Sequence, residues 1–342
     1  MSEKDIPAAS RDPQVPLAPT QPQATVPGTL GLPAAGAQGA TQPPQVDLLA
    51  DAPAATYLGS AQGNWFARVG WRHLVAWIAI VFSLFPILFV VSAAFNPLGQ
   101  LSSTTLIPTA FSGENFSKLL GTTPFTRWFG NSIVIAAVSG FLSMFLSALA
   151  AFAFSRYRFR GRRPGLMFLL LVQMFPQFLA MVAIYIMFTR ITELYPQIGF
   201  NTWWGLVILY MGGALGVNTW LMKGFFDTIP KDLDESAKVD GATHTQIFFG
   251  IILPLVAPIL AVTGLLSFIG TINEIIMANV FLTSADSKTL AIGLYGLISG
   301  ERNNNFGIFA AGTLLTAIPT VALFYSLQKY IVGGLTAGAV KG

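Results

Sequence analysis

One polar segment between two apolar ones carries most of the residues in this chain that could do chemistry. It runs from Glu235 to Pro254 and reads ESAKVDGATHTQIFFGIILP. The acids Glu235 and Asp240 can pair with basic residues of another protein, and the small side chains of Ser236 and Ala237 permit close insertion into a partner's groove. These are the properties of a docking element, whose pattern is formed by Glu235, Ser236, Ala237, Asp240, Gly241, Ile251, Leu253 and Pro254.

The residue types around this segment predict a short helix, a sharp turn and a second helix. Asp227 or Thr228 can cap the first helix, Pro230 fits its first turn, and acidic residues follow near the positive end of its dipole. Gly241 is the residue best suited to the left-handed conformation that closes a helix. A second helical run opens at Thr243 and continues into the next apolar segment, so a push on the short helix would move that segment.

Catalytic chemistry finds little support in the sequence. The two histidines, His73 and His244, have no HExxH pattern or nucleophile motif nearby, and no G-x-x-x-x-G-K-[ST] sequence occurs. Cysteine is absent, which excludes disulfides and thiolate metal sites. We therefore expect no catalytic site, metal site or cofactor in this chain, and we expect any nucleotide hydrolysis that drives it to belong to a partner.

Composition indicates an all-α, polytopic membrane protein. The chain is 53% hydrophobic and only 10% charged, with a mean hydropathy of +0.62. A membrane-spanning helix needs about 20 apolar residues. Six segments of that kind lie within a predicted membrane domain at 65–330, at about 74–95, 129–154, 166–188, 203–222, 247–272 and 306–327.

Residues 1–64 have a different composition from the rest of the chain. This stretch is rich in Pro, Ala, Gln, Thr and Gly and contains no run able to bury a core. It also lacks the charged region followed by a short apolar run that marks a cleavable signal peptide. We expect a disordered tail, with the first apolar segment retained as a membrane anchor.

Lys and Arg residues indicate the orientation of the chain in the bilayer. They concentrate before the first segment, between the second and third, in the 223–246 loop and after the sixth. Because cytoplasmic loops carry an excess of positive charge, this distribution predicts that both termini and the 223–246 loop are cytoplasmic. The net charge of +4 is then explained without a nucleic-acid partner.

Several blocks of the sequence resemble a known family of membrane proteins. The 235–254 pattern resembles the EAA loop of permease subunits of bacterial ABC importers, and from about Trp71 onward the chain resembles the maltose/maltodextrin type. Ser236 stands where the family pattern has Ala, a change between two small residues. The resemblance rests on QMFP at 173–176, the run from Lys223 to Thr243, LPL at 253–255, PILAV at 258–262 and GLTAGAVKG at 334–342.

The resemblance implies a type I ABC importer permease fold in the bacterial cytoplasmic membrane. It also implies three partners: a second, different permease, a homodimer of ATPases that binds ATP and Mg, and an extracytoplasmic sugar-binding protein. A C-terminal tail at 331–342 would reach the ATPases as a thin strand, through Gly334, Leu335, Thr336, Gly338, Lys341 and Gly342. An outer loop would meet the binding protein, with candidates Thr283, Ser284, Asp286, Lys288, Asn303 and Asn304.

Several alternatives remain open from the sequence. The cargo could be another di- or oligosaccharide, or the chain could be a membrane scaffold or sensor that docks a cytoplasmic protein without passing solute. A proton-coupled carrier is a third possibility, but such carriers normally need ionisable residues along their path, and the spans contain almost none. Asn273 and Glu274, near the outer end of the fifth span, fit either a structural hydrogen bond or a substrate contact. Tyr210 could stack on a sugar ring.

Overall fold

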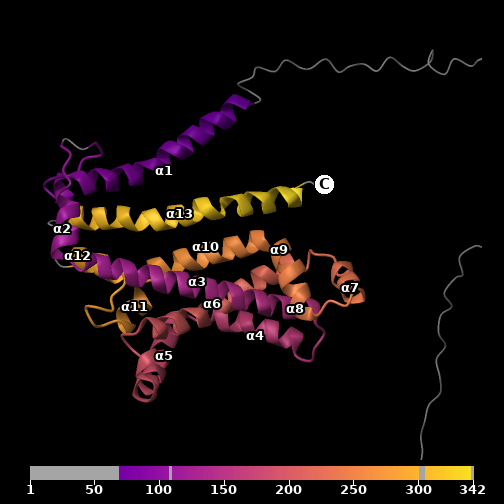
Figure 1. Cartoon of the computed structure of the whole chain (residues 1–342). Coiled ribbons are helices and arrows are strands. Elements are labelled where there is room, and N and C mark those ends of the chain that lie inside the picture. Colours follow the sequence, from indigo (N-terminus) through magenta and orange to yellow (C-terminus); the bar gives the residue numbers. More distant parts are fainter. Residues whose placement is uncertain (1–68, 108–109, 300–304, 340–342) are drawn as a thin grey trace, which may run out of the picture. The chain divides into compact units, whose positions relative to one another are not determined.

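The structure is a computed structural model that describes residues 69–107, 110–299 and 305–339, apart from the side chains of residues 177–178 and 332–339. Within these ranges all regular structure is helical and no strand occurs, which confirms the all-α prediction. The tail expected at 1–64 lies outside the described residues. Figure 1 shows the helices in their chain order.

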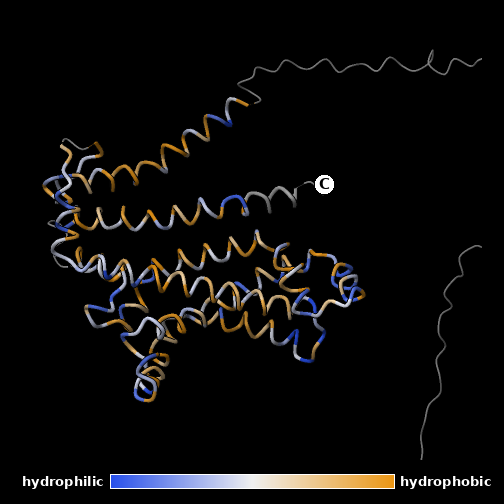
Figure 2. The backbone as a smooth tube through the Cα atoms, viewed as in Figure 1, coloured by the Kyte–Doolittle hydropathy of each residue, from blue (hydrophilic) through white to orange (hydrophobic). Residues whose placement is uncertain are grey.

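Four described helices are long and apolar enough to cross a membrane. They are α1 (Trp71–Phe95), α3 (Phe125–Arg156), α6 (Trp203–Phe226) and α13, which spans the membrane over Phe306–Ile331 and continues as helix to Ala339. Figure 2 shows that their residues are mainly apolar and that polar residues gather where the helices end. The helix to Ala339 differs from the thin strand expected for the tail, since Gly334, Leu335, Thr336 and Gly338 are helical. Lys341 and Gly342 lie outside the described residues.

Two further spans are broken, which brings the number to six if each bent pair is one span. The first pair is α4 (Arg162–Met174) with α5 (Gln177–Leu194), bent by 101°, and Pro176 lies at the break. Proline has no N–H to donate and clashes with the preceding turn, so it ends a helix there. The second pair is His244–Leu255 with α10 (Ala257–Asn273), bent by 78° at Val256. The sequence did not predict that these two spans would be bent so sharply.

The α3 helix lies at the centre of the bundle and packs on both α6 and α10. Its small residues make this close packing possible, because a row of serines, including Ser139, Ser143 and Ser147, is buried along it. At Gly140 an added Cβ would lie 3.4 Å from the backbone nitrogen of Phe268 in α10. The two backbones are therefore nearly in contact, and α3 is held on both sides.

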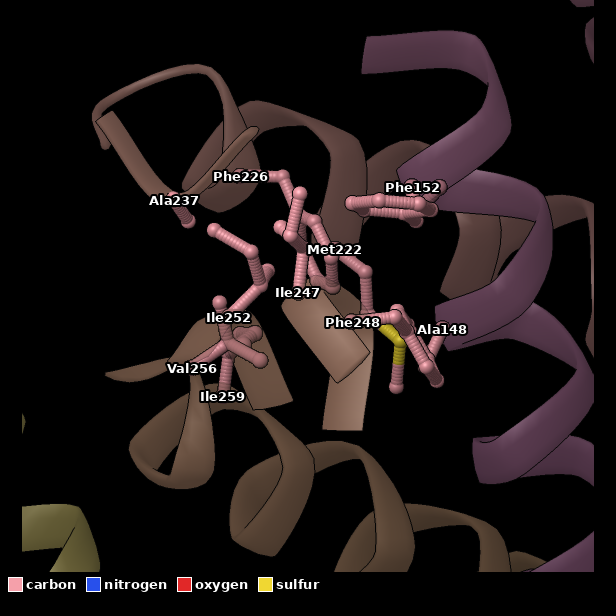
Figure 3. Close-up of a cluster of buried hydrophobic side chains, with 11 residues drawn as sticks. Ala148, Phe152, Met222, Phe226, Ala237, Ile247, Phe248, Ile252, Val256 and Ile259 are labelled. Atoms are coloured by element: carbon pink, nitrogen blue, oxygen red, sulfur yellow. The ribbon is translucent and has the colours of Figure 1, made fainter. Parts of the chain in front are cut away.

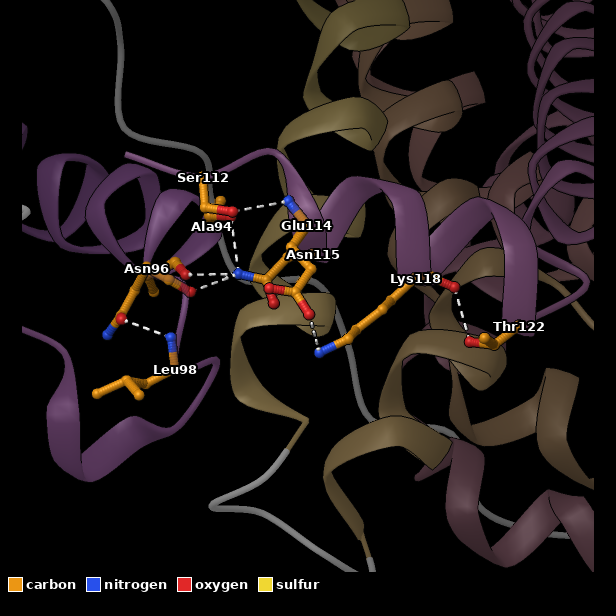
Figure 4. Close-up of polar contacts among 9 residues, drawn as sticks. Ala94, Asn96, Leu98, Ser112, Glu114, Asn115, Lys118 and Thr122 are labelled. Atoms are coloured by element: carbon orange, nitrogen blue, oxygen red, sulfur yellow. Dashed lines mark hydrogen bonds and ion pairs between the residues drawn. The ribbon is translucent and has the colours of Figure 1, made fainter. Parts of the chain in front are cut away.

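Three short helices that the sequence did not predict lie between the spans: α2 (Glu114–Thr122), α11 (Ile276–Phe281) and α12 (Leu290–Ser299). Asn115 fixes α2 to the end of α1, because its buried side-chain amide donates to the carbonyls of Ala94 (3.0 Å) and Asn96 (2.8 Å) (Figure 4). These two carbonyls belong to the last turn of α1 and its cap, which have no partner within the helix. Asn115 therefore satisfies the end of α1 and positions α2 at the same time.

Candidate functional site

The short helix expected near residue 235 is α7 (Asp232–Val239). Its first turn carries Asp232, Asp234 and Glu235, as the dipole argument requires. The prediction that Asp227 or Thr228 caps it is wrong, because α6 continues to Phe226 and Asp227 is the C-cap of α6 instead. The N-cap of α7 is Lys231, which makes no side-chain capping bond.

Gly241 closes α7 as expected. Its φ is +83°, in the left-handed region. The N–H of Gly241 donates to the carbonyl of Lys238 (3.0 Å), and the N–H of Ala242 donates to the carbonyl of Ala237 (2.9 Å). This pair of bonds is the Schellman arrangement that satisfies the last carbonyls of a helix. The turn after α7 is therefore defined by hydrogen bonds.

The next helical run begins with a capping box. The hydroxyl of Thr243 accepts from the N–H of Gln246 (3.3 Å), and the side chain of Gln246 accepts from the N–H of Thr243 (2.8 Å). The chain then continues through α8 (His244–Gln246), a π-helical segment (Ile247–Ile252) and α9 (Leu253–Leu255). The straight connection into the membrane that the sequence suggested therefore ends at the bend at Val256.

The inner face of α7 packs against the protein's own core. Ala237 is only 8% exposed and belongs to a buried cluster that includes Met222, Phe226, Ile247 and Ile252 (Figure 3). The expectation that Ala237 enters a partner's groove is therefore corrected, because its methyl group is already covered. Ile251 and Leu253 are half-buried against the same cluster, whereas Pro254 is exposed.

The outer face of α7 remains available to a partner. Glu235, Ser236, Val239 and Asp240 are exposed, and Val239 is 88% exposed. An apolar side chain this open, with two acids on the same short helix, is suited to contact with another protein. The docking residues predicted from the sequence thus divide into two sets. Ala237, Ile251 and Leu253 anchor the segment to the core of the chain, and Glu235, Ser236 and Asp240 lie on the face presented to a partner.

A buried ion pair joins α7 to α3. Arg156 Nε lies 2.6 Å from Asp234 Oδ2, and the two side chains are only 5% and 9% exposed. The same guanidinium donates to the carbonyls of Phe226 (3.3 Å) and Ile229 (3.2 Å). Sequence reasoning missed this pair, because Arg156 stands among several arginines that all fit a cytoplasmic anchor. Only the position of Arg156 at the end of a long apolar segment distinguishes it from the other arginines in the sequence.

A second polar contact joins α3 to the end of α6. Asp227 accepts from the hydroxyl of Ser155 (2.6 Å) and from Lys223 Nζ (2.5 Å). Partial burial raises the pKa of the Asp227 carboxyl, but these hydrogen bonds and the positive charges of Lys223 and Arg162 outweigh it and hold the pKa below its ordinary value. Asp227 is therefore ionised at neutral pH and holds the two helix ends together.

A cavity of about 80 Å³ lies beside the buried ion pair, between α7 and the end of α3. Tyr157 and His244 border it, and their rings lie 5.6 Å apart between centroids. Lys238 borders it from α7. Within the described ranges no three His, Asp or Glu side chains gather closely enough to hold a metal ion.

The outer-loop candidates are engaged within the chain. Asp286 forms an ion pair with Arg127 of α3, and Asn131 of α3 donates to the backbone carbonyls of Asp286 (2.9 Å) and Lys288 (3.0 Å). Thr283 and Ser284 both donate to the side-chain oxygen of Asn201, at 3.2 and 2.8 Å. The loop at 283–288 is therefore fixed by its neighbours. Asn303 and Asn304 lie outside the described residues.

The sequence left open whether Glu274 makes a structural hydrogen bond or a substrate contact, and the structure shows the structural hydrogen bonds. Its carboxylate accepts from the N–H groups of Met277 (2.8 Å) and Ala278 (2.9 Å), and from the hydroxyl of Tyr210 (2.6 Å). It thus serves the unpaired N–H groups at the start of α11. Asn273 donates to the carbonyl of Ile269 within α10.

Known proteins share both the sequence and the fold. Residues 143–336 match the family described as the binding-protein-dependent transport system inner membrane component. The chain is 39% identical to the galactooligosaccharides transport system permease protein GanQ of Bacillus subtilis, over 79% of this chain and 94% of the relative. It is 38% identical to the maltodextrin transport system permease protein MdxG of the same species, over 76% and 91%.

It is also 37% identical to the maltose/maltodextrin transport system permease protein MalG of Escherichia coli, over 81% of this chain and 97% of the relative. Among solved structures, a bacterial ABC transporter that imports the acidic polysaccharide alginate aligns with a TM-score of 0.64 and 22% identity, over 78% of this chain and 98% of that one. The all-helical fold with its candidate membrane spans agrees with these matches. The chain belongs to the binding-protein-dependent transport system inner membrane component family and is a multi-pass inner-membrane permease subunit with the ABC importer fold.

Proposed function

We propose that this permease subunit carries maltose and maltodextrins into the cell. Support comes from its identity of 37 to 38% with maltodextrin and maltose/maltodextrin permeases along nearly their full length. The C-terminal GLTAGAVKG block, which resembles this type, points to the same cargo. Neutral sugars need no counter-charge along their path, in keeping with spans that contain almost no ionisable residue.

The energy for transport comes from a homodimer of ATPases that binds ATP and Mg on the cytoplasmic side. The single observation that carries this part of the proposal is the geometry of α7: its inner face is fixed to the chain through Ala237 and Asp234, and its outer face presents Glu235, Ser236 and Val239. A short helix held in this way can receive force from a partner and pass it on without bending. The Lys and Arg distribution supports a cytoplasmic position for α7 and both termini.

Two further partners complete the importer. A second, different permease of the companion type forms the rest of the membrane pathway, and an extracytoplasmic sugar-binding protein delivers the sugar at the opposite face. A solved relative of the fold, aligned with a TM-score of 0.56, is an alginate transporter in complex with an alginate-bound periplasmic protein. The loop at 283–288 is the surface proposed to meet the binding protein here, and its internal hydrogen bonds preorganise it for that contact.

A second candidate cargo is a galactooligosaccharide. The observation that favours it is the 39% identity with a galactooligosaccharide permease, which is as high as the identity with the maltodextrin relatives. Both cargoes are neutral oligosaccharides, so the proposed energy coupling is the same for either. The two differ only in the stereochemistry that the pathway and the binding protein must accept.

Transport by a reconstituted complex tests both parts of the proposal. The permease is placed in liposomes with its companion permease and the ATPases, and uptake of labelled maltose, maltotriose and a galactooligosaccharide is followed with the binding protein outside. We expect ATP-dependent uptake, fastest for the maltose series. Faster uptake of the galactooligosaccharide would assign the second cargo, and uptake driven by a proton gradient without the ATPases would overturn the mechanism.

A charge reversal on α7 tests the coupling surface. Glu235→Lys reverses an exposed acid on the presenting face, and we expect it to reduce both recovery of the ATPases with the permease and sugar uptake. The matched control is Glu193→Lys, which reverses an exposed acid at the end of α5 that is paired with Arg190. Equal effects of the two reversals would show that α7 is not the docking surface.

A further inference from the structure

The backbone that connects α7 to the fifth span is not one straight helix. After Gly241 it passes through the π-helical segment 247–252 and then bends by 78° at Val256 before α10 begins. A π-helical turn interrupts the regular hydrogen-bond ladder of a helix. Force applied to α7 therefore meets two irregular points before it reaches the long part of the fifth span.

Contacts through Arg156 offer a more direct route. One planar guanidinium joins three elements: its Nε faces Asp234 of α7, and its two amino groups donate to Phe226, at the end of α6, and to Ile229, in the turn before α7. A guanidinium has donors in a fixed fork, so its two amino groups hold the carbonyls of Phe226 and Ile229 while its charge attracts the carboxylate of Asp234. Both side chains are almost fully buried, so separating α7 from α3 would break an ion pair that is shielded from water, which costs free energy.

The opposite end of α3 makes a similar set of contacts with the outer loop. Arg127 pairs with Asp286, and Asn131 donates to the carbonyls of Asp286 and Lys288. The helix between these two ends is unbroken and contains no proline over its 32 residues. At 1.5 Å per residue it spans about 48 Å, enough to cross the bilayer from one surface to the other.

We propose that α3 is a strut that ties α7 on one face of the membrane to the loop at 283–288 on the other, with Arg156 and Asp234 as the positioning residues at its inner end. This inference rests on the proposed function, in which the ATPases act on α7 and the binding protein acts on the outer loop. The strut makes the two surfaces move together, so that binding outside and ATP hydrolysis inside are linked through one helix.

The first experiment measures coupling in the reconstituted complex. The variants are Asp234→Asn, which removes the charge, and Arg156→Lys, which keeps the charge but loses the fork. We expect both complexes to assemble and hydrolyse ATP, while labelled maltotriose taken up per ATP hydrolysed falls several-fold. We also expect a smaller ratio between hydrolysis with and without the sugar-loaded binding protein. Glu114→Gln, in the exposed Glu114–Lys118 pair of α2, is the control and should change neither quantity.

A cross-link tests the strut even where the charge variants fail to fold. Tyr157 at the end of α3 and Lys238 on α7 both border the cavity and are both exposed. The natural chain has no cysteine, so Tyr157→Cys with Lys238→Cys supplies the only thiols of the subunit. Joining them with a short bifunctional thiol reagent should leave uptake equal to that of the same variant before cross-linking, because α3 and α7 already move as one.

Two outcomes would overturn the strut. One is loss of uptake on cross-linking, which would mean that α7 must move relative to α3. The other is a normal ratio of sugar to ATP in an assembled Asp234→Asn complex. Failure of the unmodified complex to import any sugar with ATP would count against the proposed function instead, so the two failures can be told apart.

Discussion

Gly241 sets the direction in which the chain leaves α7. Its φ of +83° is a conformation that residues with a Cβ adopt only at a cost. No atom lies within 4 Å of the place where a Cβ would stand, so a substitution there meets no steric clash and its cost is purely conformational. Gly241→Ala should therefore destabilise the turn by about 1 to 2 kcal/mol, and Gly241→Asn should cost less because Asn tolerates this region.

Thermal unfolding of the purified subunit in detergent, together with ATP-dependent uptake, measures this effect. The matched control is Gly224→Ala near the end of α6, since that glycine also has open space around it but has a helical conformation. We expect the control to be neutral or slightly stabilising. Equal behaviour of the Gly241→Ala and Gly224→Ala variants would show that the left-handed turn is unimportant.

Asp227 makes the contact between α3 and α6 sensitive to acid. Its pKa in the folded protein is lower than in the unfolded chain, so the stabilisation is complete above the ordinary pKa of Asp, about 3.9, and is lost as the pH falls through the folded value. Its side chain is 41% exposed, which limits the contribution to less than about 1 kcal/mol. Asp227→Asn should therefore lower the unfolding temperature slightly at pH 7.

The pH dependence of that difference is the informative measurement. Unfolding temperatures of the natural chain and of Asp227→Asn, recorded from pH 7 to pH 3, should begin to converge as the pH falls below about 4, because Asp227 is then protonated first in the unfolded chain and, at its lower folded pKa, also in the folded protein. A gap that stays constant down to pH 3 would mean that the charge of Asp227 contributes nothing to the junction with Ser155 and Lys223.

At the scale of whole elements, α12 packs closely against α3 because Gly293 has no side chain. A Cβ added at Gly293 would stand 2.1 Å from the ring of Trp128, which is itself 7% exposed and cannot move aside freely. Gly293→Ala should destabilise the protein by about 1 to 3 kcal/mol through overpacking. Gly296→Ala in the same helix has open space and should not. Chemical unfolding of both variants in detergent checks the contrast, and a Gly293→Ala variant as stable as Gly296→Ala would contradict this packing.

The sequence predicts the six spans and the docking helix because both depend on local patterns. Apolar runs of membrane length, the acidic first turn of α7 and the glycine that closes it are all properties of neighbouring residues. The capping box at Thr243 and Gln246 is of the same kind, although it was recognised only in part. These features can be predicted without knowing which distant residues pack against them.

Features that depend on distant residues were not predictable. Arg156 and Asp234 are 78 residues apart, and only the packing of α7 on α3 makes them partners. Ala237 was assigned to a partner's groove because a small residue suits either surface, and the buried cluster decided between them. The sequence indicated that Pro176, Pro254 and Pro258 can kink these spans, but not how sharp the bends at Pro176 and Val256 are, because proline in a membrane helix produces anything from a slight kink to a break.

At the scale of the whole molecule, the described helices place two sets of polar contacts at opposite ends of α3. The α7 helix and the arginine-rich link between α3 and α4 lie at one end, and the loop at 283–288 lies at the other (Figure 1). The proposed function requires the first end to face the cytoplasm, where ATP is available. The orientation of the chain is therefore a direct prediction of the charge distribution.

Single-cysteine variants in the naturally cysteine-free chain test this orientation. Arg160 in the link after α3 and Ala285 in the outer loop are both exposed. A membrane-impermeant maleimide should label Ala285→Cys in cells whose cytoplasmic membrane is intact and whose outer envelope admits the reagent. It should label Arg160→Cys only after the cytoplasmic membrane is permeabilised. The reverse pattern would place α7 outside the cell, away from any ATPase, and would rule out energy input through Glu235 and its neighbours even if the fold stood unchanged.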